Sequence, residues 1–341
     1  MENCKLCLIK NADFSGSHII PHFLMKRIDN MTGTTARDNE LGFVFRESET
    51  TSYFGRSVLP EKLNEVFGVL TDEELGNYKS PMVVNNFFCS DCESKFAQIE
   101  NEYAKTLKVK TADSKLKSGL GLLFWISVLW RISILKELGL ILQKKEEELL
   151  RLILDHHLNL KCKDIDIERL KADIKCSQLA YRIIRCPDYS SDEATSLFCS
   201  PFHRMHYCVL VDEFALFFYF KKGRIDNLIQ TFGGFENDLK GKIYNTVHEG
   251  EVRIIYEREL FKKCTEEICK LMAEQMSKAH CRICDSAHVI LGGEGKTMPP
   301  ELKLQILERL ASDGNFLGRK NTFNVLIKLI YDEYLKITKI K

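Results

Sequence analysis

Residues 87–93 read FFCSDCE, so Cys89 and Cys92 stand two residues apart at the start of a helical pattern. The same spacing occurs near the amino terminus, at Cys4 and Cys7. Two residues between cysteines let one tight turn present both sulfurs to one ion, and two such pairs complete the tetrahedral four-sulfur shell that zinc favours. The sequence therefore predicts a structural zinc site. The alternative is four unrelated buried thiols.

Composition is that of a globular protein without a dominant charge. The chain has 341 residues, of which 45% are hydrophobic and 28% charged, and its formal net charge is +1. A near-neutral chain carries no global basic field, so any nucleic-acid surface has to be a local patch. Thirteen cysteines without a secretory signal pattern favour a reducing compartment, and we expect a cytoplasmic protein. The apolar run 119–130 is too short for a membrane span, which needs about 20 residues, so we expect a buried helix there and no membrane association.

Apolar periodicity predicts an α+β fold in two parts. Residues 1–115 form a zinc-bound part with a long insertion at 31–80, which includes a short strand at 42–46. Residues 116–341 form a larger, mainly helical domain that carries a small antiparallel sheet, with strands around 207–220 and 252–256.

Within these parts the pattern predicts further elements. The run YCVLVDEFALFFYF at 207–220 indicates a hairpin or two buried strands, and 288–291 indicates a short strand before a Gly-rich loop. We expect helices at 87–110, 144–157, 259–278, 299–310 and 320–337, with one or two more within 161–186.

A third cysteine pair, Cys281 and Cys284, lies outside the amino-terminal region. No second pair stands at a convincing distance from it. The pair either helps to bind a second metal or supplies two buried structural thiols, and the second interpretation is the simpler one.

Three motifs in order carry a resemblance to a known family. They are C-x2-C, then SHIIP at residues 17–21, then N-x-x-C-x2-C-E beginning at Asn86 and ending at Glu93. This order resembles the HNH endonuclease superfamily, whose members are ββα-metal nucleases. It is more similar to a bacterial group of HNH-like proteins with SHIIP, C-x2-C-E and a second glutamate seven residues on, here Glu100. The likeness covers roughly residues 1–30 and 83–105, and the run ISVLWRISI at 126–134 is also similar.

The resemblance implies a metal-dependent endonuclease, a phosphodiester hydrolase that acts on DNA. In such enzymes the strand histidine is the general base, and His18 matches it with an ordinary pKa near 6.5 that suits the task. An asparagine before the second cysteine pair orients the histidine, and Asn86 matches best, with Asn85 as its neighbour. Glu93 would help to hold Mg²⁺ or Mn²⁺, and Glu100 lies on the same helical face. Bacterial proteins of this kind often act in antiviral defence, against phage or mobile DNA.

One departure from the family pattern opens an alternative. Many HNH sites have an aspartate before the strand histidine, where this chain has Ser17, and a hydroxyl is a much poorer cation ligand. His18 could then be an ordinary core histidine, and Glu93 could simply stabilise a helix amino terminus. The alternative is a non-catalytic zinc-finger module that binds nucleic acid or a protein partner.

Candidate nucleic-acid contacts follow the second cysteine pair. Lys105 and Lys108 belong to a basic stretch that either faces solvent or lies along a phosphate backbone. Arg131 follows an apolar run and either contacts phosphate or pairs with Glu93 or Glu100. The carboxy-terminal half offers no motif, and it could hold a protein partner or a second copy of the chain.

Overall fold

A computed structural model describes most of the chain and leaves several segments undescribed. The described residues are 2–25, 41–45, 50–54, 61, 63, 82–107, 119–136, 138–158, 165–187, 189, 195–199, 206–225, 239, 244–312 and 323–339. Most of the predicted insertion at 31–80, including Arg46, lies outside them, apart from two strands and two single residues.

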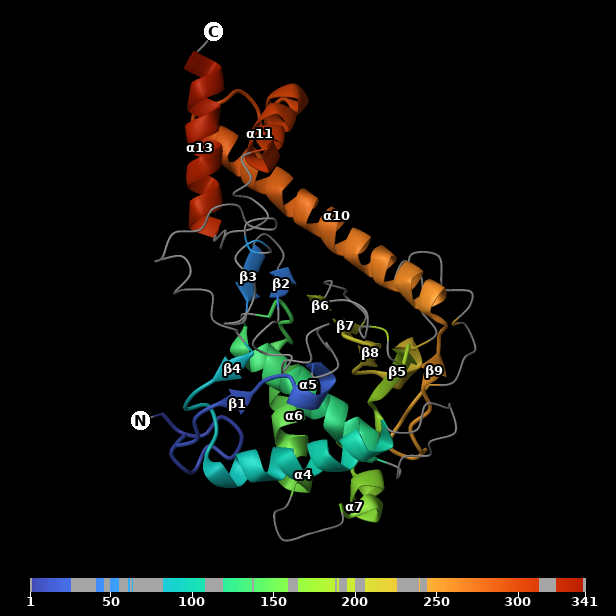
Figure 1. Ribbon diagram of the computed structural model, residues 1–341. Helices are drawn as coiled ribbons and strands as arrows, with labels where there is room; N and C mark the ends of the chain where they lie inside the picture. Colours follow the sequence, from blue (N-terminus) through green and yellow to red (C-terminus); the bar gives the residue numbers. More distant parts are fainter. Residues whose placement is uncertain are drawn as a thin grey trace.

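The described residues form a mixed α+β fold, which confirms the predicted class (Figure 1). One sheet has seven strands in the order β3-β2-β6-β7-β8-β5-β9, and a second sheet pairs β1 with β4. The predicted antiparallel sheet needs correction, because β2 runs parallel to β6 and β5 runs parallel to β9. The strands of the larger sheet are β2 (Leu41–Phe45), β3 (Thr50–Phe54), β5 (Ala180–Arg185), β6 (Thr195–Cys199), β7 (Tyr207–Val211), β8 (Phe214–Tyr219) and β9 (Ile254–Ile255).

The centre of the larger sheet is a hairpin, as the run at 207–220 predicted. β7 and β8 pair in register from Val211 opposite Phe214, and Asp212 in the turn has a left-handed φ of 47°. The run is almost continuously apolar because both faces of the hairpin are buried. Alternate residues of β5, β7 and β8 belong to two different hydrophobic cores, one on each face of the sheet.

The first core joins the cysteine region to the sheet. It contains Cys4, Cys89 and Cys92 together with most of α5 (Leu120–Leu135) and one face of the central strands. Helix α4 (Ser90–Thr106) and helix α6 (Lys144–His157) pack against α5, so the apolar run at 119–130 is a buried helix, as predicted. The division of the chain near residue 115 remains a prediction, although residues from both sides of it share this core. No helix in the described part of the chain combines the length and apolar character needed to cross a membrane.

The smaller sheet lies beside α4 (Figure 1). β1 (Ser17–His18) pairs with β4 (Val83–Val84) in antiparallel register, with Ser17 opposite Val84 and His18 opposite Val83. Short helix α1 (His22–Met25) follows β1, and α4 follows β4 after the second cysteine pair begins. Two strands and a helix therefore surround the cysteines.

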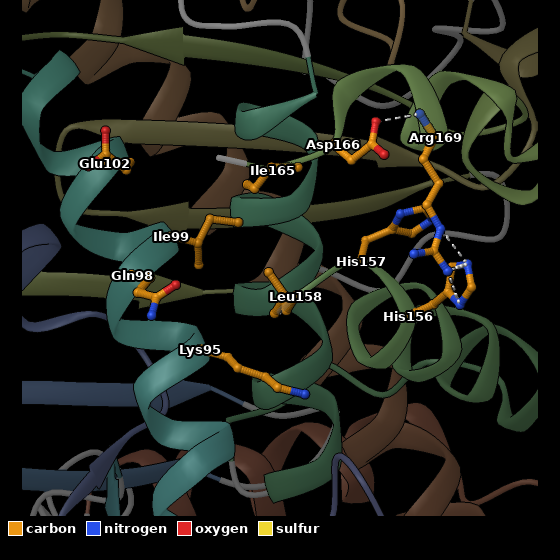
Figure 2. Close-up of a pocket in the computed structure, with 10 residues that line it drawn as sticks. All are labelled: Lys95, Gln98, Ile99, Glu102, His156, His157, Leu158, Ile165, Asp166 and Arg169. Carbon is orange, nitrogen blue, oxygen red and sulfur yellow. Dashed lines mark hydrogen bonds between the residues drawn. The ribbon is translucent and has the colours of Figure 1, made fainter. Parts of the chain in front are cut away.

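Segment 161–186 differs from the helical prediction. Its helices α7 (Ile167–Ala172) and α8 (Ile174–Ser177) are short, and its last residues form strand β5. Arg182 and Arg185 resemble the polar face of a helix in sequence, but both are buried in the strand, where Arg182 donates to the Ile225 carbonyl and Arg185 pairs with Glu213 at 2.7 Å. Helix α4, the end of α6 and the start of α7 line a pocket (Figure 2).

The strand predicted at 288–291 is wrong, because those residues end a long helix. Helix α10 (Arg258–Ile290) extends well beyond the predicted segment 259–278 and covers the second face of the sheet. It stops where Gly292 takes a φ of 79° and Gly293 donates to the His288 carbonyl, a glycine-terminated helix end. Helices α11 (Pro300–Ser312) and α13 (Phe323–Lys339) match the last two predicted helices and pack near the far end of α10 (Figure 1).

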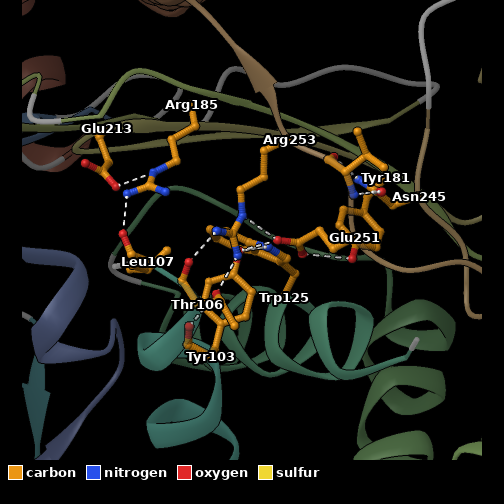
Figure 3. A network of polar contacts seen from close by, with 11 residues as sticks. Tyr103, Thr106, Leu107, Trp125, Tyr181, Arg185, Glu213, Asn245, Glu251 and Arg253 are labelled. Carbon is orange, nitrogen blue, oxygen red and sulfur yellow. Dashed lines mark hydrogen bonds and ion pairs between the residues drawn. The ribbon is translucent and has the colours of Figure 1, made fainter. Parts of the chain in front are cut away.

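A buried polar network links α4 and α5 to the sheet side of the molecule (Figure 3). Glu251 is 3% exposed and accepts hydrogen bonds from Tyr103 at 2.8 Å and Tyr181 at 3.0 Å. Arg253 pairs with the same carboxylate at 2.8 Å and also reaches Thr106. The charges are paired and hydrogen-bonded, which is the condition for burying them without a large penalty.

The network predicts that Gly121→Ala lowers the free energy of unfolding by roughly 1–3 kcal/mol, the usual cost of overpacking. A β-carbon at Gly121 would lie 2.2 Å from a Glu251 carboxylate oxygen and 2.6 Å from the Tyr181 hydroxyl, so the network would have to shift. Urea denaturation measures the change. Gly223→Ala is the control, since a β-carbon there meets nothing within 4 Å. Equal stability of the two variants would contradict the prediction.

Candidate metal centre and the His18 strand

The four cysteines of the two C-x2-C pairs meet at one point. Their sulfur atoms all lie within 4.8 Å of one another, and Cys7 Sγ is 4.0 Å from Cys89 Sγ. Cys4, Cys89 and Cys92 are buried and Cys7 is half-buried. The cluster could therefore bind a metal such as zinc, as the spacing predicted.

Backbone hydrogen bonds hold the two cysteine turns side by side. In the first turn Leu8 donates to the Cys4 carbonyl and takes a left-handed φ of 59°. Lys5 then donates to the Phe87 carbonyl at 2.9 Å, and Phe14 donates to the Phe88 carbonyl at 3.0 Å. These bonds place the first pair against the chain that enters the second pair.

The thiols share hydrogen bonds and burial, and these shift their pKa values in opposite directions. The hydrogen bond from Cys92 lowers the pKa of Cys4 to about 4. The same bond and burial raise the pKa of Cys92 far above its ordinary value, and burial raises the pKa of Cys89. Binding of a divalent ion to these thiols would release their protons.

His18 lies on β1, and its neighbour Ser17 contacts the acidic start of α4. The preceding residue, Ser17, is fully buried, and its hydroxyl donates to Glu93 Oε2 at 3.1 Å. Burial raises the pKa of Glu93, while the nearby Arg131 charge and the Ser17 hydrogen bond oppose that rise. His18 is itself half-buried. The strand that carries the histidine is therefore tied to the first turn of the helix that carries Glu93.

The side-chain hydrogen bonds to the chain before β1 are accepted by Asn85, the neighbour of the predicted Asn86. Asn85 Oδ1 accepts from the Ser15 hydroxyl and from the Gly16 amide, each at 2.8 Å. The backbone of Asn86 is left-handed, with a φ of 58°, and its amide donates to the Phe14 carbonyl. The left-handed backbone at Asn86 directs the chain from β4 into the second cysteine pair. The side chain of Asn85 reaches the loop that precedes β1.

The prediction that Arg131 contacts nucleic acid needs correction. Its side chain is 1% exposed, and Nη1 lies 2.7 Å from Glu100 Oε1 and 2.8 Å from the His18 carbonyl oxygen. The guanidinium also donates to the Ser127 carbonyl. Arg131 thus forms an ion pair within the protein, the alternative to a phosphate contact, and its partner is Glu100. An arginine buried among these groups does not reach a phosphate backbone.

The other predicted residues are spread over the molecule. Lys105 is exposed on the last turn of α4 and pairs with Glu102, and Lys108 lies outside the described residues. Cys281 and Cys284 lie on α10, where burial raises the pKa of Cys284 to about 11. Within the described ranges neither thiol joins a group of three or more metal-ligating side chains, which agrees with structural cysteines.

Two further residues support the cysteine site, although no pattern in the sequence predicts their role. Asp13 accepts from the Ser90 amide at 2.9 Å and so caps the first turn of α4 from 77 positions away. Arg151 on α6 donates to the Leu6 carbonyl at 2.9 Å and braces the first cysteine turn. Both contacts join distant segments, so no local pattern points to them.

Comparisons with known proteins add no relative. No protein-family model matches the chain, and neither the curated proteins nor the solved structures provide a match.

We expect Cys7→Ser to lose the ion that the four-cysteine cluster binds, because a serine hydroxyl is a poor replacement for a thiolate ligand. Elemental analysis of protein dialysed with zinc should show one zinc fewer per chain than in the wild type. The matched control is Cys281→Ser, which also replaces a half-buried cysteine and should keep the wild-type zinc content. Unchanged zinc in Cys7→Ser would refute the metal site.

Arg131→Met should lower the free energy of unfolding by roughly 3 kcal/mol, the lower end of the range for removing one partner of a buried ion pair, since the Glu100 side chain is 19% exposed. The variant leaves the Glu100 carboxylate and the His18 carbonyl without this donor. Chemical denaturation measures the loss, with Lys105→Met as an exposed control expected to change stability by less than about 0.5 kcal/mol. Similar stabilities of the two variants would show that the pairing contributes little.

Proposed function

We propose that the cysteine cluster, β1, β4 and α4 form a zinc-bound ββα module of the HNH type. The proposal is supported by the convergence of the two C-x2-C pairs, by the pairing of the His18 strand with β4, and by the start of α4 immediately after Cys89. Zinc is the metal of choice because four thiolates form its preferred shell.

Within that class, the proposed activity is metal-dependent hydrolysis of DNA phosphodiester bonds. The observation that carries it is the 3.1 Å contact between Ser17 and Glu93, which sets the histidine strand against the acidic first turn of α4. His18 accepts a proton from the attacking water, a role for which an imidazole is suited near neutral pH. Arg131 is a positioning residue, since it binds the His18 carbonyl.

The residues present suit a single hard cation with few protein ligands. Glu100 is engaged by Arg131, so the carboxylate that remains for the ion is Glu93, half-buried and hydrogen-bonded to Ser17. Mg²⁺ commonly keeps several waters and takes only one or two carboxylates together with substrate phosphate. When bound, such an ion would stabilise the negative charge that develops on the phosphate and on the leaving oxygen.

A biological role follows from the family resemblance. A cytoplasmic nuclease of this kind would act against phage or mobile DNA, and the carboxy-terminal helices would provide a surface for a protein partner or a second copy of the chain. Lys105 is exposed at the end of α4 and is the described candidate for a phosphate contact.

A second candidate function is binding without cleavage. It is favoured by Ser17, a hydroxyl at the position where many HNH sites have an aspartate ligand, and by the engagement of Glu100 with Arg131. In this case the module binds zinc and nucleic acid or protein, and no cation binds beside His18.

The nuclease proposal predicts that purified protein nicks supercoiled DNA in Mg²⁺ or Mn²⁺ and that His18→Ala is slower by roughly 10²–10⁴-fold, the usual contribution of a general base. Gel analysis of plasmid nicking measures the rates. His248→Ala replaces an exposed histidine far along the chain and should retain the wild-type rate.

Zinc content must be equal in the three proteins, so that a loss of activity reports chemistry rather than folding. Equal rates for wild type and His18→Ala would rule out the assigned base. DNA binding in a gel-shift assay without any cleavage would favour the second candidate.

A further inference from the structure

A second group of metal-ligating side chains lies at the end of α6. It consists of His157, Asp173 and Cys176, whose ligand atoms all lie within 4.8 Å of one another. His157 is the last residue of α6, Asp173 directly precedes α8, and Cys176 lies in α8. Asp173 and Cys176 both belong to the start of α8, and the fold brings His157 to them from the end of α6.

The cluster is enclosed and its carboxylate is oriented. Cys176 is fully buried, the His157 side chain is 2% exposed and Asp173 is 21% exposed. Asp173 Oδ1 accepts from the Lys175 amide at 2.9 Å, while Oδ2 lies 3.0 Å from His157 Nε2. One carboxylate oxygen is thus fixed by the backbone, and the other faces the imidazole.

A nitrogen, an oxygen and a sulfur ligand form the mixed set that zinc-type ions accept. Ionised Asp173 and Cys176 together balance the double charge of such an ion. Binding would displace the proton of the Cys176 thiol and replace the hydrogen bond between His157 and Asp173, as metal binding to thiol and imidazole ligands generally does. The distances require only small side-chain movements.

A pocket of about 120 Å³ adjoins His157 (Figure 2). His157 lines this pocket together with residues of α4, among them Gln98 and Ile99. One water needs roughly 10–15 Å³ of such space, so the pocket has room for a water that completes the shell. The positive charge of Arg169 at its rim is directed to the neighbouring His156, whose Nε2 it contacts at 2.6 Å.

We infer that His157, Asp173 and Cys176 bind a second ion of the zinc type, with water from the adjoining pocket as the fourth ligand. The site is independent of the four-cysteine cluster and of the nuclease proposal, because it shares no ligand with either. Three protein ligands with an open position are typical of zinc sites that bind a water or a small ligand, whereas structural zinc sites are closed by four protein ligands.

The test compares zinc content by elemental analysis after equilibrium dialysis against zinc. Asp173→Asn should bind one zinc fewer per chain than the wild type. Asparagine at a helix cap is as good as aspartate, so this variant keeps the hydrogen bond from Lys175 and replaces the carboxylate that faces His157 with a neutral amide. Cys176→Ala should show the same loss. The count is a difference between variants, so it does not depend on whether the four-cysteine cluster is filled.

Two matched controls separate ligand loss from general damage. Cys264→Ala removes a buried thiol outside the cluster, and His156→Gln removes the adjacent exposed histidine. Both should keep the wild-type zinc content. Equal zinc in wild type and Asp173→Asn would overturn the inference, and so would the same loss in Cys264→Ala.

Discussion

Convergence of four sulfur atoms is the constraint on which the amino-terminal part of the structure depends. Cys7 and Cys89 are 82 positions apart, yet their sulfurs lie 4.0 Å from each other. Bringing such distant segments together costs chain entropy that grows with the loop length. Structural zinc in small modules typically contributes roughly 10–16 kcal/mol, enough to offset that cost. With the two turns joined, β1 pairs with β4, and Ser17 comes within hydrogen-bond distance of Glu93.

Helix α4 connects the cysteine region to the rest of the molecule, because its different faces contact different parts of the structure. Cys92, Phe96, Ile99 and Tyr103 enter the core, where Tyr103 stacks on Phe124 at 3.8 Å and binds Glu251. Glu93 and Glu100 turn toward the His18 strand and Arg131. Lys95, Gln98 and Glu102 line the pocket beside His157. A single helix therefore contacts the buried network and the proposed catalytic strand, and it lines the pocket that adjoins His157.

Local patterns in the sequence were enough for much of the fold. The bounds of α6, the buried α5 and the β7–β8 hairpin followed from apolar periodicity, since each element buries a face that its own residues define. The wrong predictions occur where buried polar residues interrupt the apolar periodicity. The end of the segment 161–186, expected to be helical, is strand β5 with Arg182 and Arg185 buried, and residues 288–291, expected to be a strand, lie at the end of α10. Only buried partners such as Glu213 make those residues compatible with the observed elements.

By itself the sequence determined the ligand chemistry: two C-x2-C pairs, a histidine strand and an acidic helix start, all of which depend on short spacings. Tertiary structure decided which partner each charge takes. Arg131 lies between Glu100 and the His18 carbonyl, the Asn85 side chain accepts from the Gly16 amide, and His157 comes close to Cys176. The physical reason is that hydrogen bonds and ion pairs act over a few ångströms in space. They join residues whose separation along the chain leaves no periodic trace.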